Sequence, residues 1–298
     1  MERLNGIVPV MITPMLEGGE PDEEAIDRLV NYLIERDMVG LWTLGSAGEA
    51  NHMTWKQRVK VVRASAEAVN GRIPILTGTG ATSVNEILEF INEIEAFHVD
   101  GIHVLYRDPK QGDSRMIAEL TRLADRSPIP IWLYHNPTSG KAVSTQVIKA
   151  LRDHPNVQGM KVGGYSLNEM TQALLLDTPT FQVIGAGGGQ LFTMLCLGAT
   201  AHTTGDSCWP EEFLKLYSLF CEGRLVDARE QQFRLIRLAG RLPRTDNGES
   251  CAEEKYILSL RGICHEYVNP AYRSLTLEEK ARVRQVLSDY GFEWAAKD

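Results

Sequence analysis

The chain has 298 residues, of which 43% are hydrophobic and 23% are charged, as in an ordinary globular protein. Its formal charge of −8 argues against a general nucleic-acid binder, which needs a basic face, but not against small anionic substrates, because the field of a binding site is local. The length fits either about two domains or one large α/β barrel.

Short apolar runs alternate with amphipathic helical patterns along the first two thirds of the chain. Helical spacing of apolar residues predicts helices over residues 21–36, 54–69 and 83–97. The apolar runs contain many Val, Ile and Leu residues without strict alternation, as in a parallel sheet covered on both faces. We predict eight strands over residues 7–12, 40–44, 73–77, 101–105, 129–134, 157–161, 181–184 and 199–203.

Eight strand–helix repeats predict an α/β fold of the (β/α)8 TIM barrel type. The alternative, an open doubly wound sheet, needs a glycine-rich fingerprint after the first strand, and Thr13-Pro14-Met15 is not one. Helical patterns over residues 211–221, 226–241, 252–260 and 277–287 then predict the last barrel helix and a C-terminal helical extension. We expect the barrel in residues 1–224 and the extension in residues 225–298, packed together as one structural unit.

The spacing of the cysteines and the lack of long apolar segments are typical of a cytoplasmic protein. The five cysteines lie in the last third of the chain, and none forms a Cys-x-x-Cys pair. No apolar stretch approaches the length of a membrane span, and the first six residues contain no signal-like segment. We therefore expect a cytoplasmic protein with reduced thiols, no metal and no membrane association.

Lys161 closes the sixth predicted strand, which is an unusual place for a solvated lysine. A lysine at the end of a buried strand points its amine into a pocket, where desolvation lowers its pKa and leaves a neutral nucleophile that attacks carbonyl carbons. Local context alone leaves a second reading open, a buried lysine paired with a carboxylate.

The other strand ends supply groups that fit carbonyl chemistry, since the active site of such a barrel lies at the carboxyl ends of its strands. Tyr134 closes the fifth strand and can relay protons, with Ser46 and Tyr106 continuing the hydrogen-bond chain. The glycine-flanked Ser46-Ala47 loop can turn backbone N–H groups toward a carboxylate. Together these groups predict a 2-oxo acid substrate that forms an imine on Lys161.

The ordered set of motifs resembles the family of dihydrodipicolinate synthase and N-acetylneuraminate lyase, the class I Schiff-base aldolases, over nearly the whole chain. The motifs are Gly45-Ser46-Ala47-Gly48-Glu49, Gly78-Thr79-Gly80-Ala81, Tyr106-x-x-Pro109, Tyr134-x-x-Pro137, Gly159-Met160-Lys161 and Val268-Asn269-Pro270. The resemblance implies that Lys161 forms the Schiff base, that Tyr134 and Ser46 relay protons, and that Tyr106 reaches into a neighbouring subunit's site. It also implies a homotetramer built as a dimer of dimers, with no cofactor.

Departures from the family pattern concern the second half of the substrate. Dihydrodipicolinate synthases carry an arginine shortly after the proline that follows the relay tyrosine, whereas Lys141 is the nearest cation here. Sialic acid lyases carry acidic residues after strand seven, whereas Gly187 and Gly188 stand here and would allow close approach of substrate or, less in keeping with the motifs, cradle a phosphate. Trp209, after strand eight, is either a substrate wall or a buried structural residue.

We expect a lyase of pyruvate or a related 2-oxo acid, of aldolase or hydratase-aldolase type, that acts with an aldehyde. The spacing of Tyr134-His135-Asn136-Pro137 and Lys141 is similar to that of the hydratase-aldolase branch of the family. One alternative is a 2-oxo acid dehydratase or deaminase that uses the same lysine, with Asn136 positioning a water. A 4-hydroxy-tetrahydrodipicolinate synthase and a non-catalytic 2-oxo acid sensor are further alternatives. The expected binding residues are Ser46, Ala47, Asn136, Gly187 and Gly188.

Overall fold

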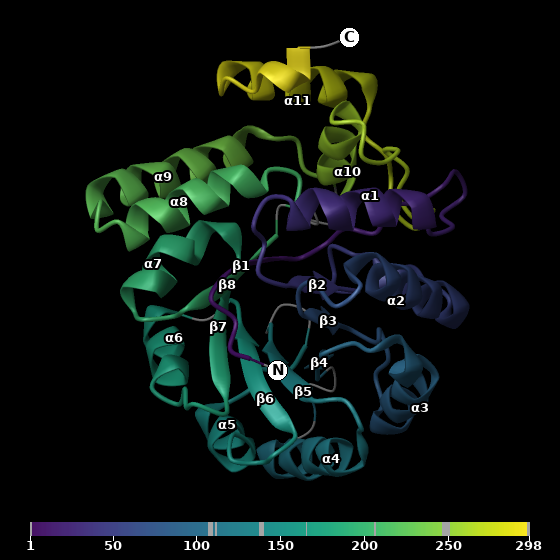
Figure 1. Cartoon of the computed structure of the whole chain (residues 1–298), viewed down its shortest axis with the longest axis vertical. Helices are drawn as coiled ribbons and strands as arrows, with labels where there is room; N and C mark the ends of the chain where they lie inside the picture. The colour runs from purple at the N-terminus through teal and green to yellow at the C-terminus, as the bar shows by residue number, and fades with distance from the viewer. Residues whose placement is uncertain are drawn as a thin grey trace.

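Eight parallel strands form a nearly closed barrel surrounded by helices (Figure 1). This computed structural model describes residues 2–106, 110, 112–136, 140–164, 166–205, 207–245 and 251–296. Pro109 and Pro137, two of the motif residues, lie outside them. The strands are β1 Gly6–Pro9, β2 Leu41–Thr43, β3 Ile75–Thr77, β4 Gly101–Leu105, β5 Ile131–His135, β6 Val157–Val162, β7 Gln182–Ala186 and β8 Ala201–Thr204.

The strand order confirms the predicted (β/α)8 barrel. From β2 to β8, each strand pairs in parallel with the next strand in the sequence, and β8 also pairs with β1. Between β1 and β2, Met11 N–H donates to Trp42 O at 3.0 Å, and Val10 and Trp42 form a parallel bridge. The predicted strands all occur: residues 101–105 coincide with β4, and the bounds of the others differ by at most three residues.

Helices follow the strands in alternation. Thr54 and Ser83 cap α2 and α3, each through a capping box, so these two helices begin where the sequence places a hydroxyl before an apolar run. The barrel helices are α1 Glu23–Ile34, α2 Trp55–Val69, α3 Val84–Ile94, α4 Asp113–Arg126, α5 Thr145–Leu151, α6 Leu167–Leu174, α7 Leu191–Cys196 and α8 Pro210–Cys221. Short 3-10 turns are η1 Ala50–His52, η2 Glu95–Phe97, η3 Gly188–Gln190 and η4 Glu293–Ala296.

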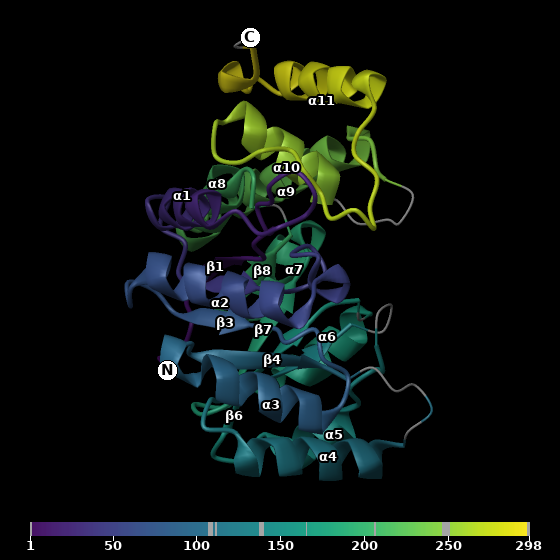
Figure 2. The same cartoon turned by 90° about the vertical axis from the view of Figure 1, so that its right-hand side faces the viewer.

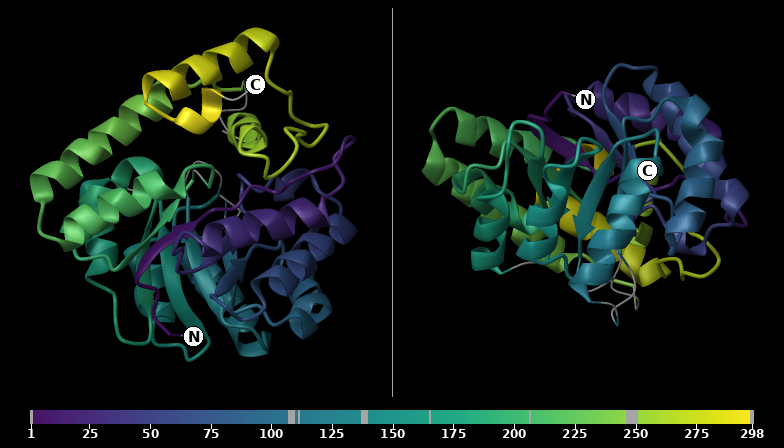
Figure 3. Two further views of the ribbon diagram at one scale, coloured as in Figure 1. Left: turned by 45° about the horizontal axis from the view of Figure 1, so that its top comes forward. Right: turned by 90° about the horizontal axis from the view of Figure 1, so that it is seen from below.

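Three further helices extend the barrel at one end of the molecule. They are α9 Leu225–Arg241, α10 Cys251–Leu260 and α11 Leu277–Asp289. Figure 2 shows α10 and α11 stacked beyond α1, α8 and α9. The right-hand view of Figure 3, seen from below, shows the yellow C-terminal helices behind the barrel strands. They fall where the sequence predicts a helical extension.

The barrel interior is a small, separate core filled by two tryptophans. It comprises Leu4, Val8, Val10, Trp42, Leu76, Trp132, Ile184 and Ala201, whereas the larger core lies between strands and helices. A Cβ atom on Gly159 would lie 2.5 Å from Trp132 Cζ3, and one on Gly101 would lie 2.9 Å from Trp132 Cδ1. Gly101 on β4 and Gly159 on β6, the two strands that flank β5, therefore make room for the indole ring of Trp132.

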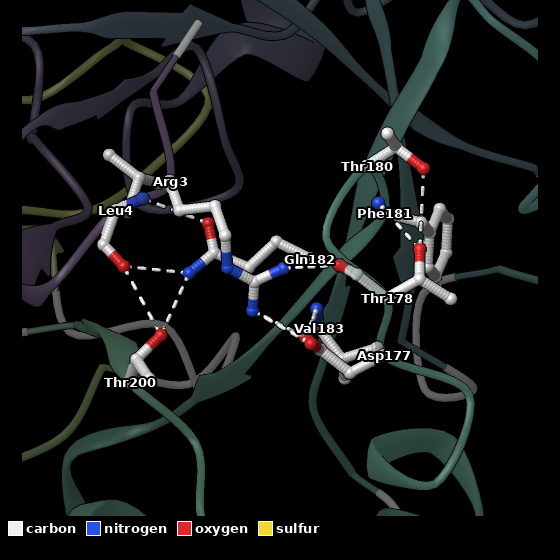
Figure 4. A network of polar contacts seen from close by, with 9 residues as sticks. All are labelled: Arg3, Leu4, Asp177, Thr178, Thr180, Phe181, Gln182, Val183 and Thr200. Atoms are coloured by element: carbon white, nitrogen blue, oxygen red, sulfur yellow. Dashed lines mark hydrogen bonds and ion pairs between the residues drawn. The ribbon is translucent and has the colours of Figure 1, made fainter.

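A polar network closes the amino-terminal end of the barrel (Figure 4). Gln182 accepts from Leu4 N–H at 2.9 Å and donates to Leu4 O at 2.7 Å and to Thr200 Oγ1 at 3.0 Å. Arg3 donates to both carboxylate oxygens of Asp177, at 2.7 and 3.0 Å. The first residues of the chain are thereby tied to β7, at the end of the barrel opposite to the loops that carry Ser46 and Asn136.

Candidate active site

Lys161 lies on β6 with its side chain inside the barrel. Its Cα pairs in register with Tyr134 on β5 and Ile184 on β7. The residue is only 4% exposed, and burial lowers the pKa of its amine to about 7. Burial thus favours the neutral, nucleophilic form of the amine over its charged form.

The surroundings of the Lys161 amine are aromatic. Lys161 Nζ lies 4.7 Å from the ring centroid of Trp42 and 4.6 Å from that of Tyr134. Within the described residues, the amine forms no hydrogen bond or ion pair, so the reading of Lys161 as the partner of a buried carboxylate finds no support among them. Ring faces attract an ammonium only weakly compared with a carboxylate, which is why burial dominates.

Trp42 and His103, two aromatic residues that face into the barrel, contribute to the aromatic surroundings of the Lys161 amine. The sequence analysis identified neither of them. Trp42 stacks on His103 with ring centroids 4.4 Å apart, and His103 Nε2–H donates to Thr43 O at 2.9 Å. Trp42 also contacts Tyr134 edge to face at 6.1 Å. The signal that could have identified them is register: Trp42 lies on β2 and His103 on β4, with their rings on the same side of the sheet as the Lys161 side chain.

The phenol of Tyr134 accepts a hydrogen bond from Asn136, two residues further along the chain. Burial raises the pKa of its phenol, and the hydrogen bond from Asn136 opposes that rise. Asn136 Nδ2 donates to Tyr134 Oη at 3.3 Å. At rest, Tyr134 is thus a protonated phenol whose oxygen accepts a hydrogen bond, which fits a group that gives and regains one proton.

The Ser46-Ala47 loop presents free backbone donors. Gly48 N–H donates to Gly45 O at 3.1 Å and Glu49 N–H donates to Ser46 O at 2.9 Å. These turns leave the amides of Ser46 and Ala47 without a hydrogen-bond partner among the described residues. Successive free amides form a concavity suited to an anion.

One cavity brings Ser46 and Tyr134 together. It also borders His103 and the Gly78-Thr79-Gly80-Ala81 turn after β3, so three of the sequence motifs meet there. Tyr106 is not among the described residues of its wall: the phenol donates to Glu119 Oε2 of α4 at 2.8 Å. Within one chain, the cavity therefore brings Tyr134 and Ser46 together, whereas Tyr106 is directed to α4.

Gly187 and Gly188, the predicted substrate-side glycines, are tied to the scaffold through their backbone. Gly187 N–H donates to Thr203 O at 3.0 Å, and its carbonyl accepts from His202 Nε2 at 2.8 Å. The Gly188 carbonyl accepts from Gln232 of α9 at 2.8 Å. Burial lowers the pKa of His202 to about 4, and the charge of Lys161 acts in the same direction, so His202 lies within electrostatic reach of the amine.

Glu49 anchors the Ser46-Ala47 loop to α10 and to the segment that contains Asn269. Its Oε1 lies 2.7 Å from Lys255 Nζ, and both side chains are fully buried. Asn269 N–H donates to Glu49 Oε2 at 2.7 Å, and Cys251 Sγ donates to Ala47 O at 3.4 Å. The start of α10 therefore lies against the loop that follows β2.

No group of three His, Cys, Asp or Glu side chains is placed to hold a metal ion in the described part of the chain. Nor is any described helix both long and apolar enough to cross a membrane. All five cysteines are free. His135, the histidine beside Tyr134, is buried, and its Nδ1 accepts from Val143 N–H at 2.9 Å.

A buried lysine with no carboxylate partner among the described residues, near the end of a strand of a (β/α)8 barrel and beside a tyrosine, is the arrangement expected of a class I aldolase barrel. The family model of the dihydrodipicolinate synthetase family matches residues 3–290, and the chain belongs to this family of lyases. The resemblance read from the sequence motifs is thereby confirmed.

Relatives and solved structures match over nearly the full chain. The 4-hydroxy-tetrahydrodipicolinate synthases of Pelobacter propionicus and Methanosphaerula palustris are each 26% identical, over 96% of this chain and 98% and 99% of theirs. Dihydrodipicolinate synthase from Bacteroides thetaiotaomicron superposes with a TM-score of 0.91 at 23% identity, covering 97% of this chain and 99% of its own. A prophage protein of the same family from E. coli K12, solved in complex with pyruvate, gives 0.86 at 23% identity, over 96% of this chain and 98% of its own. At these identities the structural likeness concerns the fold.

Proposed function

We propose that this protein is a Schiff-base-forming lyase in which Lys161 binds pyruvate or a related 2-oxo acid as an imine. The observation that carries the proposal is the state of Lys161: it is buried, has no carboxylate partner among the described residues, and has a pKa lowered to about 7. A lysine with these properties is a nucleophile at neutral pH, and no metal or organic cofactor is required for its chemistry.

The chemistry follows from the groups around the amine. Lys161 Nζ attacks the C2 carbonyl carbon, the carbonyl oxygen leaves as water, and a C=N bond replaces the C=O bond. Tyr134 moves the protons of this step, with Ser46 passing them onward. The free amides of Ser46 and Ala47 hold the carboxylate.

The imine then serves as an electron sink. Loss of a C3 proton gives the enamine, whose C3 attacks an aldehyde carbon to form a C–C bond; cleavage is the same step in reverse. Water then attacks the imine carbon of the product and returns Lys161 as the free amine. In the hydratase-aldolase variant, elimination or addition of water at the new C–C bond accompanies this step.

We place the active enzyme in a homotetramer, a dimer of dimers, in which Tyr106 of one subunit extends the relay of another. Glu119 then holds the Tyr106 phenol through the 2.8 Å hydrogen bond. Exposed apolar side chains on α6 and α9, among them Leu167 at 57% and Phe233 at 44%, support contact with further copies. The free cysteines support a reducing, cytoplasmic compartment.

A second candidate is 4-hydroxy-tetrahydrodipicolinate synthase, the name carried by the relatives. Lys141, the cation nearest to the expected arginine position, argues against it. Lys141 Nζ already lies 3.9 Å from Asp113, and its backbone N–H donates to Tyr106 O. It is thus a poor substitute for the arginine that binds the second substrate's carboxylate in that activity.

Product analysis separates these candidates. The purified enzyme is incubated with arylidene-pyruvates, with 4-hydroxy-2-oxo acids, and with pyruvate plus aspartate semialdehyde. Pyruvate and an aldehyde as products support the lyase, whereas loss of water or ammonia with an intact carbon chain supports the dehydratase or deaminase. Imine formation without turnover of any of these substrates supports the sensor alternative.

A further inference from the structure

Trp42 lies beside the amine that forms the proposed imine. Lys161 Nζ lies 4.7 Å from the centroid of the Trp42 ring and 4.6 Å from that of Tyr134, and over no other ring among the described residues. Both distances are within the range in which the face of an aromatic ring attracts a cation, and an indole ring attracts it most strongly. Trp42 therefore acts on the charge that the Lys161 nitrogen carries.

The indole ring of Trp42 is buried and held in place. The residue is 0% exposed, its ring stacks on His103 with centroids 4.4 Å apart, and Trp132 contacts it edge to face at 6.4 Å. Its Nε1–H has no hydrogen-bond partner in the part of the chain that the structure describes, so no hydrogen bond within that part explains a tryptophan at this position. Burial strengthens the attraction between ring and cation, because water does not compete with it.

The imine brings a positive charge to the Lys161 nitrogen. The neutral amine, the C2 carbonyl and one proton combine to give one water, which carries away the carbonyl oxygen, and a C=N bond with the charge on Nζ. Loss of a C3 proton then leaves its bonding electrons to neutralise the nitrogen. A carboxylate beside Nζ would stabilise the charged imine, but it would also hold the resting amine in its protonated, unreactive form. A ring face attracts a cation more weakly, which is compatible with the lowered pKa of the resting amine, about 7.

We propose that Trp42 is a further catalytic residue, whose ring face stabilises the positively charged imine between Lys161 and the 2-oxo acid. The proposal rests on the imine function of Lys161 and adds the group that offsets the charge of that imine. Among the described residues no carboxylate forms an ion pair with the amine, so the two ring faces are the groups there that favour a charge on Nζ. Tyr134 also moves protons, whereas Trp42 has no proton to exchange, so the effect of a ring face is measured most cleanly at Trp42.

The first test replaces the indole by groups that attract a cation less. Trp42→Phe keeps an aromatic face of weaker attraction, and Trp42→Leu keeps apolar carbon without a ring. The pyruvate concentration that gives half of the maximal borohydride-trapping rate should rise about tenfold or more in Trp42→Leu and less in Trp42→Phe. The midpoint of the trapping rate against pH should fall by about one unit in Trp42→Leu, because the ring also favours the resting ammonium. A midpoint that stays or rises, as entry of water into the vacated space would cause, overturns the proposal.

The second test changes the charge distribution of the ring and keeps its shape. Tetrafluorotryptophan at position 42 withdraws electron density from the ring face and should raise the half-saturating pyruvate concentration about tenfold or more. The control is the same replacement of Trp132, which is 1% exposed and whose Nε1 likewise has no partner among the described residues; it should change nothing. An unchanged value at position 42, or equal effects at the two positions, overturns the proposal. Failure of the unmodified protein to trap pyruvate would instead overturn the function of Lys161.

Discussion

Removing the amine of Lys161 should make the protein more stable, and the gain should depend on pH. The folded-state pKa of Lys161 is about 7, against an ordinary value of 10.5, so between these values the unfolded chain binds a proton that the folded protein does not. Stability therefore rises with pH across this window. The penalty is about 4 kcal/mol at pH 7 and about 2 kcal/mol at pH 9.

The perturbation is Lys161→Met, which keeps the length of the side chain and removes the charge. The free energy of unfolding should increase by up to about 4 kcal/mol at pH 7, and the gain should shrink by about 2 kcal/mol at pH 9. The measurement is urea denaturation at fixed protein concentration, followed by tryptophan fluorescence and by far-UV circular dichroism.

Lys255→Met is the matched control, because Lys255 is also fully buried but has a partner 2.7 Å away, Glu49. Removing one member of a buried ion pair leaves an uncompensated charge, so this variant should lose about 3–5 kcal/mol. If Lys161→Met were destabilising at pH 7, or if its gain were the same at pH 9, the reasoning about an unpaired buried amine would be refuted.

Three further substitutions test the relay, the closed end of the barrel and its packing. Tyr134→Phe should slow turnover about 10²–10⁴-fold with the fold intact, and undiminished turnover would refute its relay role. Gln182→Leu leaves the backbone groups of Leu4 short of partners and should cost about 2–4 kcal/mol by chemical denaturation; a loss below about 1 kcal/mol would contradict the network's role. Gly159→Ala should lower the free energy of unfolding by about 1–3 kcal/mol, because its Cβ would lie 2.5 Å from Gln182 O. Gly112→Ala is the control: its Cβ would have no atom within 4 Å, and it should cost less. Equal losses in the two variants would argue against the packing explanation.

Local patterns were enough to predict the fold. The eight strands and the C-terminal helices were found from apolar runs and helical spacing, because parallel strands covered on both sides are nearly continuous in apolar residues. Their ends were displaced by up to three residues. Strand β1, for example, was expected over residues 7–12 and is Gly6–Pro9, since hydrogen bonding, not hydrophobicity, ends a strand.

The aromatic residues around the Lys161 amine could not be predicted from local patterns. Trp42 and His103 lie on strands that are covered on both faces and therefore carry apolar residues on both. Without alternation of polar and apolar residues, the sequence does not show which side chains face the inside of the barrel. That choice is set by the register of the closed barrel. The direction of Tyr106, whose phenol contacts Glu119, likewise depends on a helix that follows it by several residues.

The surroundings of Trp209 were beyond sequence reasoning for a different reason. The sequence placed Trp209 after strand eight and left its role open. In the structure it is buried, directly precedes α8 and stacks on Phe292 of the C-terminal extension, with ring centroids 6.1 Å apart. Only the packing of the extension against the barrel brings these two rings together.

The most direct measurement for the central claim is borohydride trapping with pyruvate over a range of pH, followed by peptide mapping. We expect a single covalent adduct on Lys161, with a trapping rate that rises with pH and has its midpoint near pH 7, following the pKa of the amine. Lys161→Ala should abolish the adduct. No adduct, an adduct on another lysine, or a midpoint near the ordinary pKa of lysine would contradict the account.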